Sequence, residues 1–247
     1  GNISETVKSL PSQVDVETVS GAVVKKDVIW NTGASQFEGT EFRASSISGT
    51  VWGGKTLWGA PLTVNVPVGQ VMPSGTVYFI DSVEGDPSKV STTEPYEAVK
   101  AKVGDQLLNK VYDQKKADSN SWGLVDADAQ TKGYNNDTTD MAATGIYGKN
   151  NEVGETLSYA FTLPAGSYKI ISGHREWWGN SRNMAASINF AGKSQDAGII
   201  NLGGKSDYIH SASFKLDSGQ LVTYTLTAKN AQAPVISWLA VIQADTA

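Results

Sequence analysis

Two adjacent tryptophans, Trp177 and Trp178, follow the strand-like stretch 168–172. Neighbouring side chains of an extended chain point to opposite faces, so at least one of the two indoles should face away from the core. An exposed indole presents a flat apolar face that can cover the C–H groups of a sugar ring, while polar neighbours bind the hydroxyls at its rim. We therefore expect the binding chemistry of this chain in the segment 173–183.

The segment 173–183 also holds side chains that donate and accept hydrogen bonds. Charged groups form hydrogen bonds roughly twice as strong as neutral ones. We expect one indole to stack on a ligand and the other to pack, while Arg175 and Glu176 could instead form a surface ion pair worth less than about 1 kcal/mol. The polar candidates are His174, Arg175, Glu176, Asn180, Arg182 and Asn183.

A second aromatic candidate, Trp122, lies in the stretch 112–151, which is poor in aliphatic residues and rich in Asp, Asn, Ser, Thr and Gly. Asp113 is a polar partner for a ligand in the same stretch. Loops of this length are usually functional or disordered, and the aromatic residues favour a function. Trp122 could equally anchor the long connection onto the core, and the sequence leaves both interpretations open.

The composition excludes several classes of protein. The 247 residues carry a formal net charge of -5 and no basic tract, which argues against nucleic acids and anionic membranes as partners. There is no cysteine, which excludes disulfides, zinc–thiolate sites and cysteine nucleophiles. The sequence shows no recognisable pair of catalytic carboxyl groups, Gly-x-Ser-x-Gly motif or nucleotide-binding loop, so we expect no catalysis by this chain.

The sequence has neither a signal peptide nor an apolar run long enough to span a bilayer. We expect a monomeric fragment of a longer protein, with targeting signals elsewhere and no cofactor. Three groups of oxygen-bearing side chains could bind a structural calcium ion, but none has helix–loop–helix spacing and solvated turns explain them better. The groups are Asp81, Glu84 and Asp86; Asp126 and Asp128; and Asn135, Asn136, Asp137 and Asp140.

Short β-branched and aromatic runs, separated by Gly, Asn and Ser, predict an all-β chain. In the first part, apolar and polar residues alternate as in half-buried strands. The order of 10–14, 28–30, 47–51 and 62–66 resembles a bacterial Ig-like repeat, which implies a small Ig-like β-sandwich acting as a spacer. Prolines and glycines in 67–75 interrupt the pattern, so we predict domains over residues 1–70 and 71–247.

The sequence of the second domain predicts a larger antiparallel β-sandwich. It opens with a strand over 75–80, and residues 96–111 indicate either a short helix interrupted at Gly104 or an irregular loop. Short turns such as 163–166 join the later strands, which favours two packed sheets. These later strands are predicted over 156–163, 166–173, 184–190, 197–202, 211–216, 221–228 and 235–242.

Four segments of this domain, 159–170, 174–178, 184–192 and 234–241, carry a resemblance to a known family. Their order resembles the galactose-binding-type or malectin-like carbohydrate-binding modules, and is most similar to family 71 modules of streptococcal surface β-galactosidases. The resemblance implies a galactose-binding-like jelly roll. It also implies a non-catalytic module that recognises terminal β-galactose and tethers a cell-wall-attached, Gram-positive glycoside hydrolase to glycans.

The family pattern also implies particular site residues. An aromatic pair follows the Gly-x-Tyr strand in malectin-like domains, which corresponds to Trp177 and Trp178 here. Two further family positions, an aromatic before the Tyr-x-Phe strand and a polar residue before the last strand, have Tyr147 and Asn230 as their nearest matches. Asn230 departs from the family, which usually has an acid there.

Galactose fits the expected chemistry because its axial O4 leaves C3, C4, C5 and C6 as one apolar patch for an indole to cover. A rival interpretation is an adhesin fragment that binds a host protein through aromatic hot spots. A catalytic domain and a purely structural spacer are further alternatives that the sequence leaves open.

Overall fold

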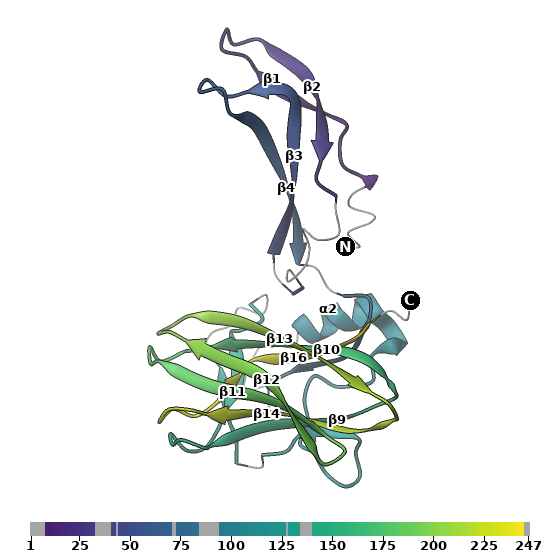
Figure 1. Cartoon of the computed structure of the whole chain (residues 1–247), viewed down its shortest axis with the longest axis vertical. Coiled ribbons are helices and arrows are strands. Elements are labelled where there is room, and N and C mark those ends of the chain that lie inside the picture. Colours follow the sequence, from purple (N-terminus) through teal and green to yellow (C-terminus); the bar gives the residue numbers. More distant parts are fainter. Residues whose placement is uncertain are drawn as a thin grey trace. The chain divides into compact units, whose positions relative to one another are not determined.

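The computed structural model describes residues 8–32, 41–42, 44–70, 73–83, 94–126, 128–133 and 140–244. The chain divides into two compact units, Gly1–Pro73 and Ser74–Ala247. Strands dominate both units, so the predicted all-β class is confirmed (Figure 1). Within the described ranges, neither the length nor the apolar character of any helix is sufficient for a bilayer span.

The first unit is an antiparallel sheet in the order β1-β2-β3-β4. Tight backbone turns, with Thr18 N–H bonded to Ala22 O and Thr56 N–H to Ala60 O at 2.8 Å each, join successive strands as neighbours. The described residues of this unit thus form one layer, where an Ig-like sandwich would have two. The strands are β1 (Gln13–Glu17), β2 (Val23–Trp30), β3 (Ala44–Lys55) and β4 (Pro61–Gln70).

The second unit contains two large sheets. Their strands are β5 (Thr76–Asp81), β6 (Trp122–Leu124), β9 (Thr156–Leu163), β10 (Gly166–Arg175), β11 (Arg182–Phe190), β12 (Lys193–Leu202), β13 (Asp207–Leu216), β14 (Gln220–Ala228) and β16 (Trp238–Gln243). One sheet runs β13-β10-β16-β5 and the other β12-β11-β14-β9-β6, with antiparallel pairing throughout. The predicted sandwich is confirmed, and β9 has the predicted bounds.

The core of this unit follows from period-two patterning. In β11, Met184, Ala186 and Ile188 are buried while the residues between them are half-buried, and β14 alternates in the same way. Side chains from both large sheets join one continuous apolar cluster. Burial of this cluster is the main source of stability in a chain that has no disulfide.

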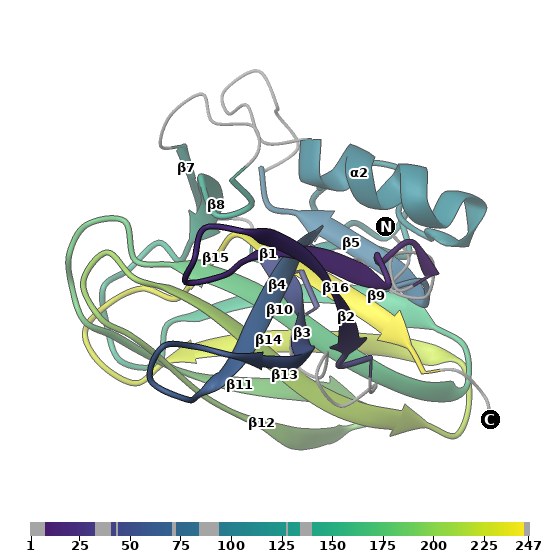
Figure 2. The same cartoon turned by 90° about the horizontal axis from the view of Figure 1, so that it is seen from above.

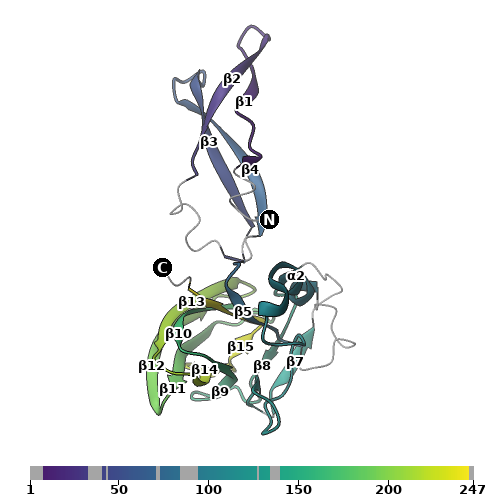
Figure 3. The same cartoon turned by 90° about the vertical axis from the view of Figure 1, so that its right-hand side faces the viewer.

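The stretch 112–151 differs from the long loop predicted for it. Besides β6, it contributes β7 (Gln130–Gly133) and β8 (Thr144–Tyr147), which form a small sheet in the order β15-β8-β7 with β15 (Val235–Ile236). The sequence does not predict β7 and β8, because their residues are mostly polar or small. In Figures 2 and 3, β7 and β8 lie on the side of the unit away from β11 and β12.

The predicted strand 235–242 is broken at Ser237. Its first part, β15, pairs with β8, and its second part, β16, pairs with β10 and β5. The Ser237 backbone N–H donates to Gly173 O at 2.8 Å, and its carbonyl accepts from Ser82 N–H at 2.9 Å. The predominantly apolar segment 235–242 thus contributes strands to two sheets.

The helix expected near residue 96 is present as α2 (Glu94–Val103), followed by the 3₁₀ turn η2 (Gly104–Gln106). Gly104 has φ +58°, a left-handed conformation that ends an α-helix at little cost in a residue without Cβ. The helix alternative for this region is therefore correct.

The ends of β8, β10 and β11 meet beside the segment 229–234. Lys229 N–H donates to Asn183 O at 2.8 Å, and Gly148 N–H donates to Pro234 O at 3.0 Å. The main-chain bonds bring segments that are far apart in sequence to one end of the sandwich. Most of the candidate site residues lie there.

Candidate functional site

The loop 176–181 is built around the carboxylate of Glu176, the first residue after β10. This side chain is fully buried, and its Oε2 accepts backbone N–H bonds from Trp178 at 2.9 Å, from Gly179, and from Asn180 at 2.8 Å. Three hydrogen bonds to one carboxylate oxygen fix the backbone on both sides of Trp178. The predicted ligand-binding role of Glu176 is therefore corrected, because its carboxylate is enclosed by its own loop.

Arg182 completes this arrangement from the start of β11. Its Nε donates to Glu176 Oε1 at 2.9 Å and its Nη1 donates to Ala233 O at 2.5 Å, with the guanidinium almost fully buried. The Arg182 Cζ lies 4.8 Å from the ring centroid of Trp178, a cation–π contact. Arg182 thus supports the indole from below the surface and does not present a free charge to a ligand.

The two tryptophans divide between core and surface. Trp177 is 3% exposed and its Nε1–H donates to Ala142 O at 3.0 Å. Its ring fits against Gly145, where a Cβ would lie 2.5 Å from Cη2 of the indole. Trp178 is 37% exposed, with its ring perpendicular to that of Trp177 at a centroid distance of 5.6 Å. The expectation of one packing and one outward-facing indole is confirmed, and Trp178 is the exposed one.

Tyr147, at the end of β8, borders the exposed indole. Its ring centroid lies 5.1 Å from that of Trp178 with an interplanar angle of 77°, and the residue is half-buried. The structure therefore brings together three predicted residues, Trp178, Tyr147 and Arg182, from three different strand ends. The aromatic rings of Trp178 and Tyr147 form the candidate binding surface.

Asn230 and Asn183 lie beside this group. Asn230 Oδ1 accepts from Asn183 N–H at 3.1 Å, and its Nδ2 donates to Ser181 O at 2.7 Å. These two bonds fix residues 181–183 at the start of β11. The side-chain amide of Asn230 is therefore hydrogen-bonded to backbone groups. Asn180, by contrast, is exposed on the loop that carries Trp178.

His174 is not available to a ligand, which corrects its predicted role. It is 1% exposed on β10, and its Nδ1 lies 2.7 Å from Val235 O. A carbonyl can only accept, so Nδ1 carries the proton and Nε2 accepts from Ser172 Oγ at 2.7 Å. Burial lowers the pKa of His174 to about 4, so the ring is neutral near pH 7.

Arg175 is held by two carboxylates, and no surface pair with Glu176 forms. Its guanidinium bonds to Asp140 Oδ2 at 2.6 Å and to Asp207 Oδ1 at 2.5 Å. Hydrogen bonds to Asp207 are the largest of the causes that raise its pKa. Because Arg175 and Glu176 are neighbours at the end of a strand, their side chains diverge, and each finds a partner elsewhere.

Trp122 and Asp113 belong to the core, which corrects their prediction as ligand residues. Trp122 is 5% exposed on β6 and packs against Tyr78 with ring centroids 6.4 Å apart. Asp113 is buried, and its Oδ2 accepts from the Tyr159 hydroxyl at 3.2 Å. The anchoring interpretation of Trp122 is the correct one, because β6 pairs with β9 at the edge of the large sheet.

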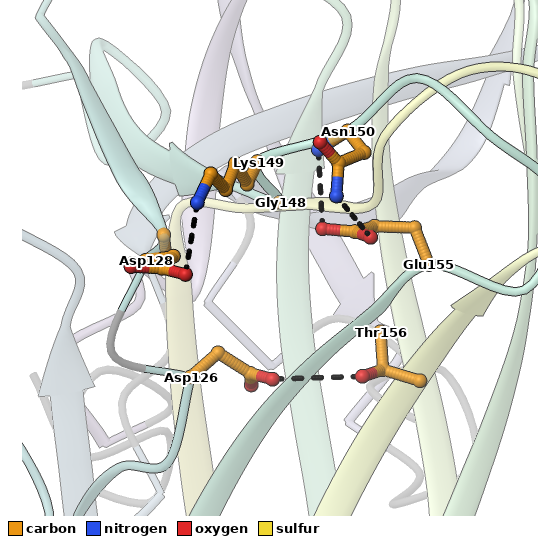
Figure 4. Close-up of a pocket in the computed structure, with 8 residues that line it drawn as sticks. Asp126, Asp128, Gly148, Lys149, Asn150, Glu155 and Thr156 are labelled. Atoms are coloured by element: carbon orange, nitrogen blue, oxygen red, sulfur yellow. Dashed lines mark hydrogen bonds and ion pairs between the residues drawn. The ribbon is translucent and has the colours of Figure 1, made fainter.

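A polar cavity that the sequence did not reveal lies next to this end of the sandwich (Figure 4). Its volume is about 240 Å³. Lys149 Nζ lies 3.1 Å from Asp128 Oδ2, and Asn150 donates to Glu155 through N–H at 3.1 Å and Nδ2 at 3.3 Å. The lining residues are Asp126, Asp128, Ala129, Gly148, Lys149, Asn150, Glu155 and Thr156.

The described residues of the three groups considered as calcium ligands are not arranged as a metal site. Glu84, Asp86 and Asn135 to Asp137 lie outside them. Of the rest, Asp140 pairs with Arg175 and Asp128 with Lys149. Among the residues that the structure describes, no group of three or more His, Cys, Asp or Glu side chains is arranged to hold a metal ion.

No protein-family model and no curated protein sequence matches the chain. Among solved structures, the chain is similar to a family 22 module joined to a xylanase of Clostridium thermocellum, with 10% identity, TM-score 0.39, and coverage of 51% of this chain but 27% of that one. It is also similar to a family 35 carbohydrate-binding module of Cellvibrio japonicus, with 20% identity, TM-score 0.34, and coverage of 51% of this chain and 95% of that one.

A third similar structure is a family 36 module of a multidomain xylanase from the hindgut metagenome of Trinervitermes trinervoides. Its identity is 18% and its TM-score 0.34, with coverage of 47% of this chain and 88% of that one. Carbohydrate-binding modules thus recur among the structural neighbours. The likeness is one of strand arrangement, and it assigns no residue of the site described above.

Proposed function

We propose that the second unit is a non-catalytic carbohydrate-binding module that stacks a sugar ring on Trp178. The observation that carries this proposal is an indole 37% exposed at the end of a β-sandwich and supported on its buried sides. Tyr147 and Trp177 pack against it edge to face, and the guanidinium of Arg182 lies over its ring. A rigid aromatic surface loses little conformational entropy when a ligand binds, which favours recognition.

The charges around Trp178 favour an uncharged sugar. Arg182 is paired with Glu176, and Arg175 is paired with Asp140 and Asp207. An acidic sugar would need a free cation, and neither of these arginines supplies one. Among neutral sugars we propose terminal β-galactose, as in lactose or N-acetyllactosamine, because the C3–C6 patch of galactose matches a flat indole.

The proposed biological role is to hold a parent glycoside hydrolase on galactose-terminated glycans at the surface of a Gram-positive cell. A shallow aromatic site immobilises few ligand atoms, so a dissociation constant on the order of 1 mM is expected for a monosaccharide. Attachment to the same polypeptide would raise the effective concentration of the enzyme at its substrate. The first unit would serve as a spacer.

A glycan array probed with the whole chain tests the proposal. Binding to galactosides, competed by free lactose, is expected for the native chain and should weaken about tenfold or more in Trp178→Ala. The matched control is Trp58→Ala, which removes an indole that is 94% exposed on the first unit and should leave binding unchanged. Galactoside binding of unchanged strength in Trp178→Ala, or binding that requires Trp58, would contradict the proposal.

The adhesin alternative makes a different prediction on the same array. A host-protein adhesin would show no galactoside signal, and lactose would not displace it from its partner. Catalysis is tested by incubation with aryl galactosides. Because Glu176 is fully buried and bonded to three backbone N–H groups and Arg182, we expect no turnover from it.

A further inference from the structure

The polar cavity is connected to the aromatic surface around Trp178 through the chain segment 147–151. Its lining residues Gly148, Lys149 and Asn150 directly follow Tyr147 in the chain. The next residue, Asn151, accepts a hydrogen bond from Ala233 N–H at 3.0 Å through Oδ1. The carbonyl of the same Ala233 accepts from Arg182, whose guanidinium lies over Trp178. The cavity and the indole therefore share supporting residues.

The side chains that line the cavity supply more hydrogen-bond acceptors than donors. Asp126, Asp128 and Glu155 supply three carboxylates, and Lys149 supplies one ammonium group. Each carboxylate has about four acceptor sites, so the internal hydrogen bonds leave several lone pairs unused. The carboxylate of Asp126 is partly buried, which raises its pKa, and it accepts hydrogen bonds from Ser158 N–H and the Thr156 hydroxyl. A ligand rich in hydroxyl donors would satisfy these acceptors.

We propose that this cavity binds one sugar ring through its hydroxyl groups, as a second subsite beside the Trp178 surface. The inference rests on the proposed function and extends it from one ring to two. A volume of about 240 Å³ is below the range of roughly 300–1,000 Å³ for pockets that enclose drug-sized ligands, so a single ring is the appropriate size. Three carboxylates against one lysine select neutral sugars and repel uronic acids.

Backbone amide shifts in ¹⁵N-correlated NMR spectra of the whole chain test this subsite during titration with galactose. The amides of Gly148, Lys149 and Asn150 are expected to shift in the native chain and, with an apparent dissociation constant within about threefold, in Trp178→Ala. In Glu155→Gln, which turns one acceptor into a donor, their apparent affinity should fall about tenfold or more while the Trp178 indole still responds. Galacturonic acid should leave all three amides unshifted.

Lys149→Ala provides a second variant that keeps the fold, because the lysine side chain is 53% exposed. It should also weaken the galactose-dependent shifts at the cavity, since it removes the only ammonium donor among the lining residues. Absence of shifts at 148–150 at saturating galactose would overturn the inference. So would shifts produced by calcium chloride alone, which would make the cavity a cation site. If galactose shifts the amides of residues 148–150 but leaves the indole N–H signal of Trp178 unchanged, the proposed stacking surface is rejected and the cavity subsite is retained.

Discussion

Replacement of Glu176 by glutamine should destabilise the second unit strongly although the change is nearly isosteric. The native carboxylate is fully buried and uses one oxygen for three backbone N–H groups and the other for Arg182 Nε. A glutamine has one acceptor oxygen and one amide donor. Whichever way it is oriented, either the backbone N–H groups or Arg182 must face an N–H group.

The magnitude follows from the burial of the ion pair. Both side chains are at most 3% exposed, so either Arg182 Nε or the three backbone N–H groups would lose their acceptor in the protein interior. Loss of one partner of a buried ion pair typically costs about 3–5 kcal/mol. For a unit of this size, that corresponds to a melting temperature lower by roughly 6–20 °C.

Thermal unfolding followed by circular dichroism measures this effect. The control is Glu152→Gln, an exposed residue on the neighbouring loop, for which a change within about 0.5 kcal/mol is expected. Galactoside affinity of Glu176→Gln, measured below its melting temperature, should also fall because the loop that carries Trp178 loses its hydrogen bonds. A melting temperature equal to that of the control variant would refute the role of Glu176 as the centre of this loop.

Three further predictions concern buried residues of the second unit. Burial lowers the folded-state pKa of His174 from 6.5 to about 4, so the unfolded chain binds more protons than the folded chain between these pH values. As pH drops from 7 to 4, urea titrations should show the stability of the native chain falling by about 3 kcal/mol relative to His174→Gln. A stability difference that stays constant with pH would contradict this prediction. Desolvation, with the charge of Asp113, raises the pKa of the buried Asp81 carboxyl group. Asp81→Asn should therefore gain stability relative to the native chain as pH rises from 4 to 7, and a gain that is largest at pH 4 would show the opposite sign. Trp122→Ala should lower the free energy of unfolding in urea by about 3–5 kcal/mol, because the Trp122 ring packs in the core. The galactoside affinity of the folded variant should be unchanged. A loss of affinity without a loss of stability would indicate that Trp122 is a ligand-binding residue.

Local sequence signals were sufficient for most of the large strands. Thr156–Leu163 was predicted with correct bounds because alternation of apolar residues ends at Pro164, where the chain turns. The break at Ser237 is not evident from the sequence, because apolar residues flank this single serine on both sides, and only the partners of 235–236 and 238–242 in two different sheets divide the segment. Because these partner strands are distant in sequence, the local alternation of apolar and polar residues does not indicate them.

The candidate site was predictable as a region but not in the role of each residue. The pair Trp177 and Trp178 was correctly divided between packing and exposure, but which ring is buried depends on Gly145 and the carbonyl of Ala142. The local sequence predicts Glu176 as a ligand residue, because nothing near it indicates that its own loop encloses the carboxylate. A glycine and an asparagine shortly after a glutamate, as in Gly179 and Asn180, are a signal that could have indicated a carboxylate-centred loop.

The indole N–H resonance of Trp178 during a galactose titration tests the central claim most directly. It can be assigned by its disappearance in Trp178→Phe, and the Trp177 indole, bonded to Ala142 O, serves as an internal reference in the same spectrum. We predict a saturable shift of the Trp178 signal and little change in that of Trp177. If the Trp178 signal stays unmoved while galactose binds elsewhere, or if galactose does not bind at all, the exposed indole is not the sugar-stacking surface.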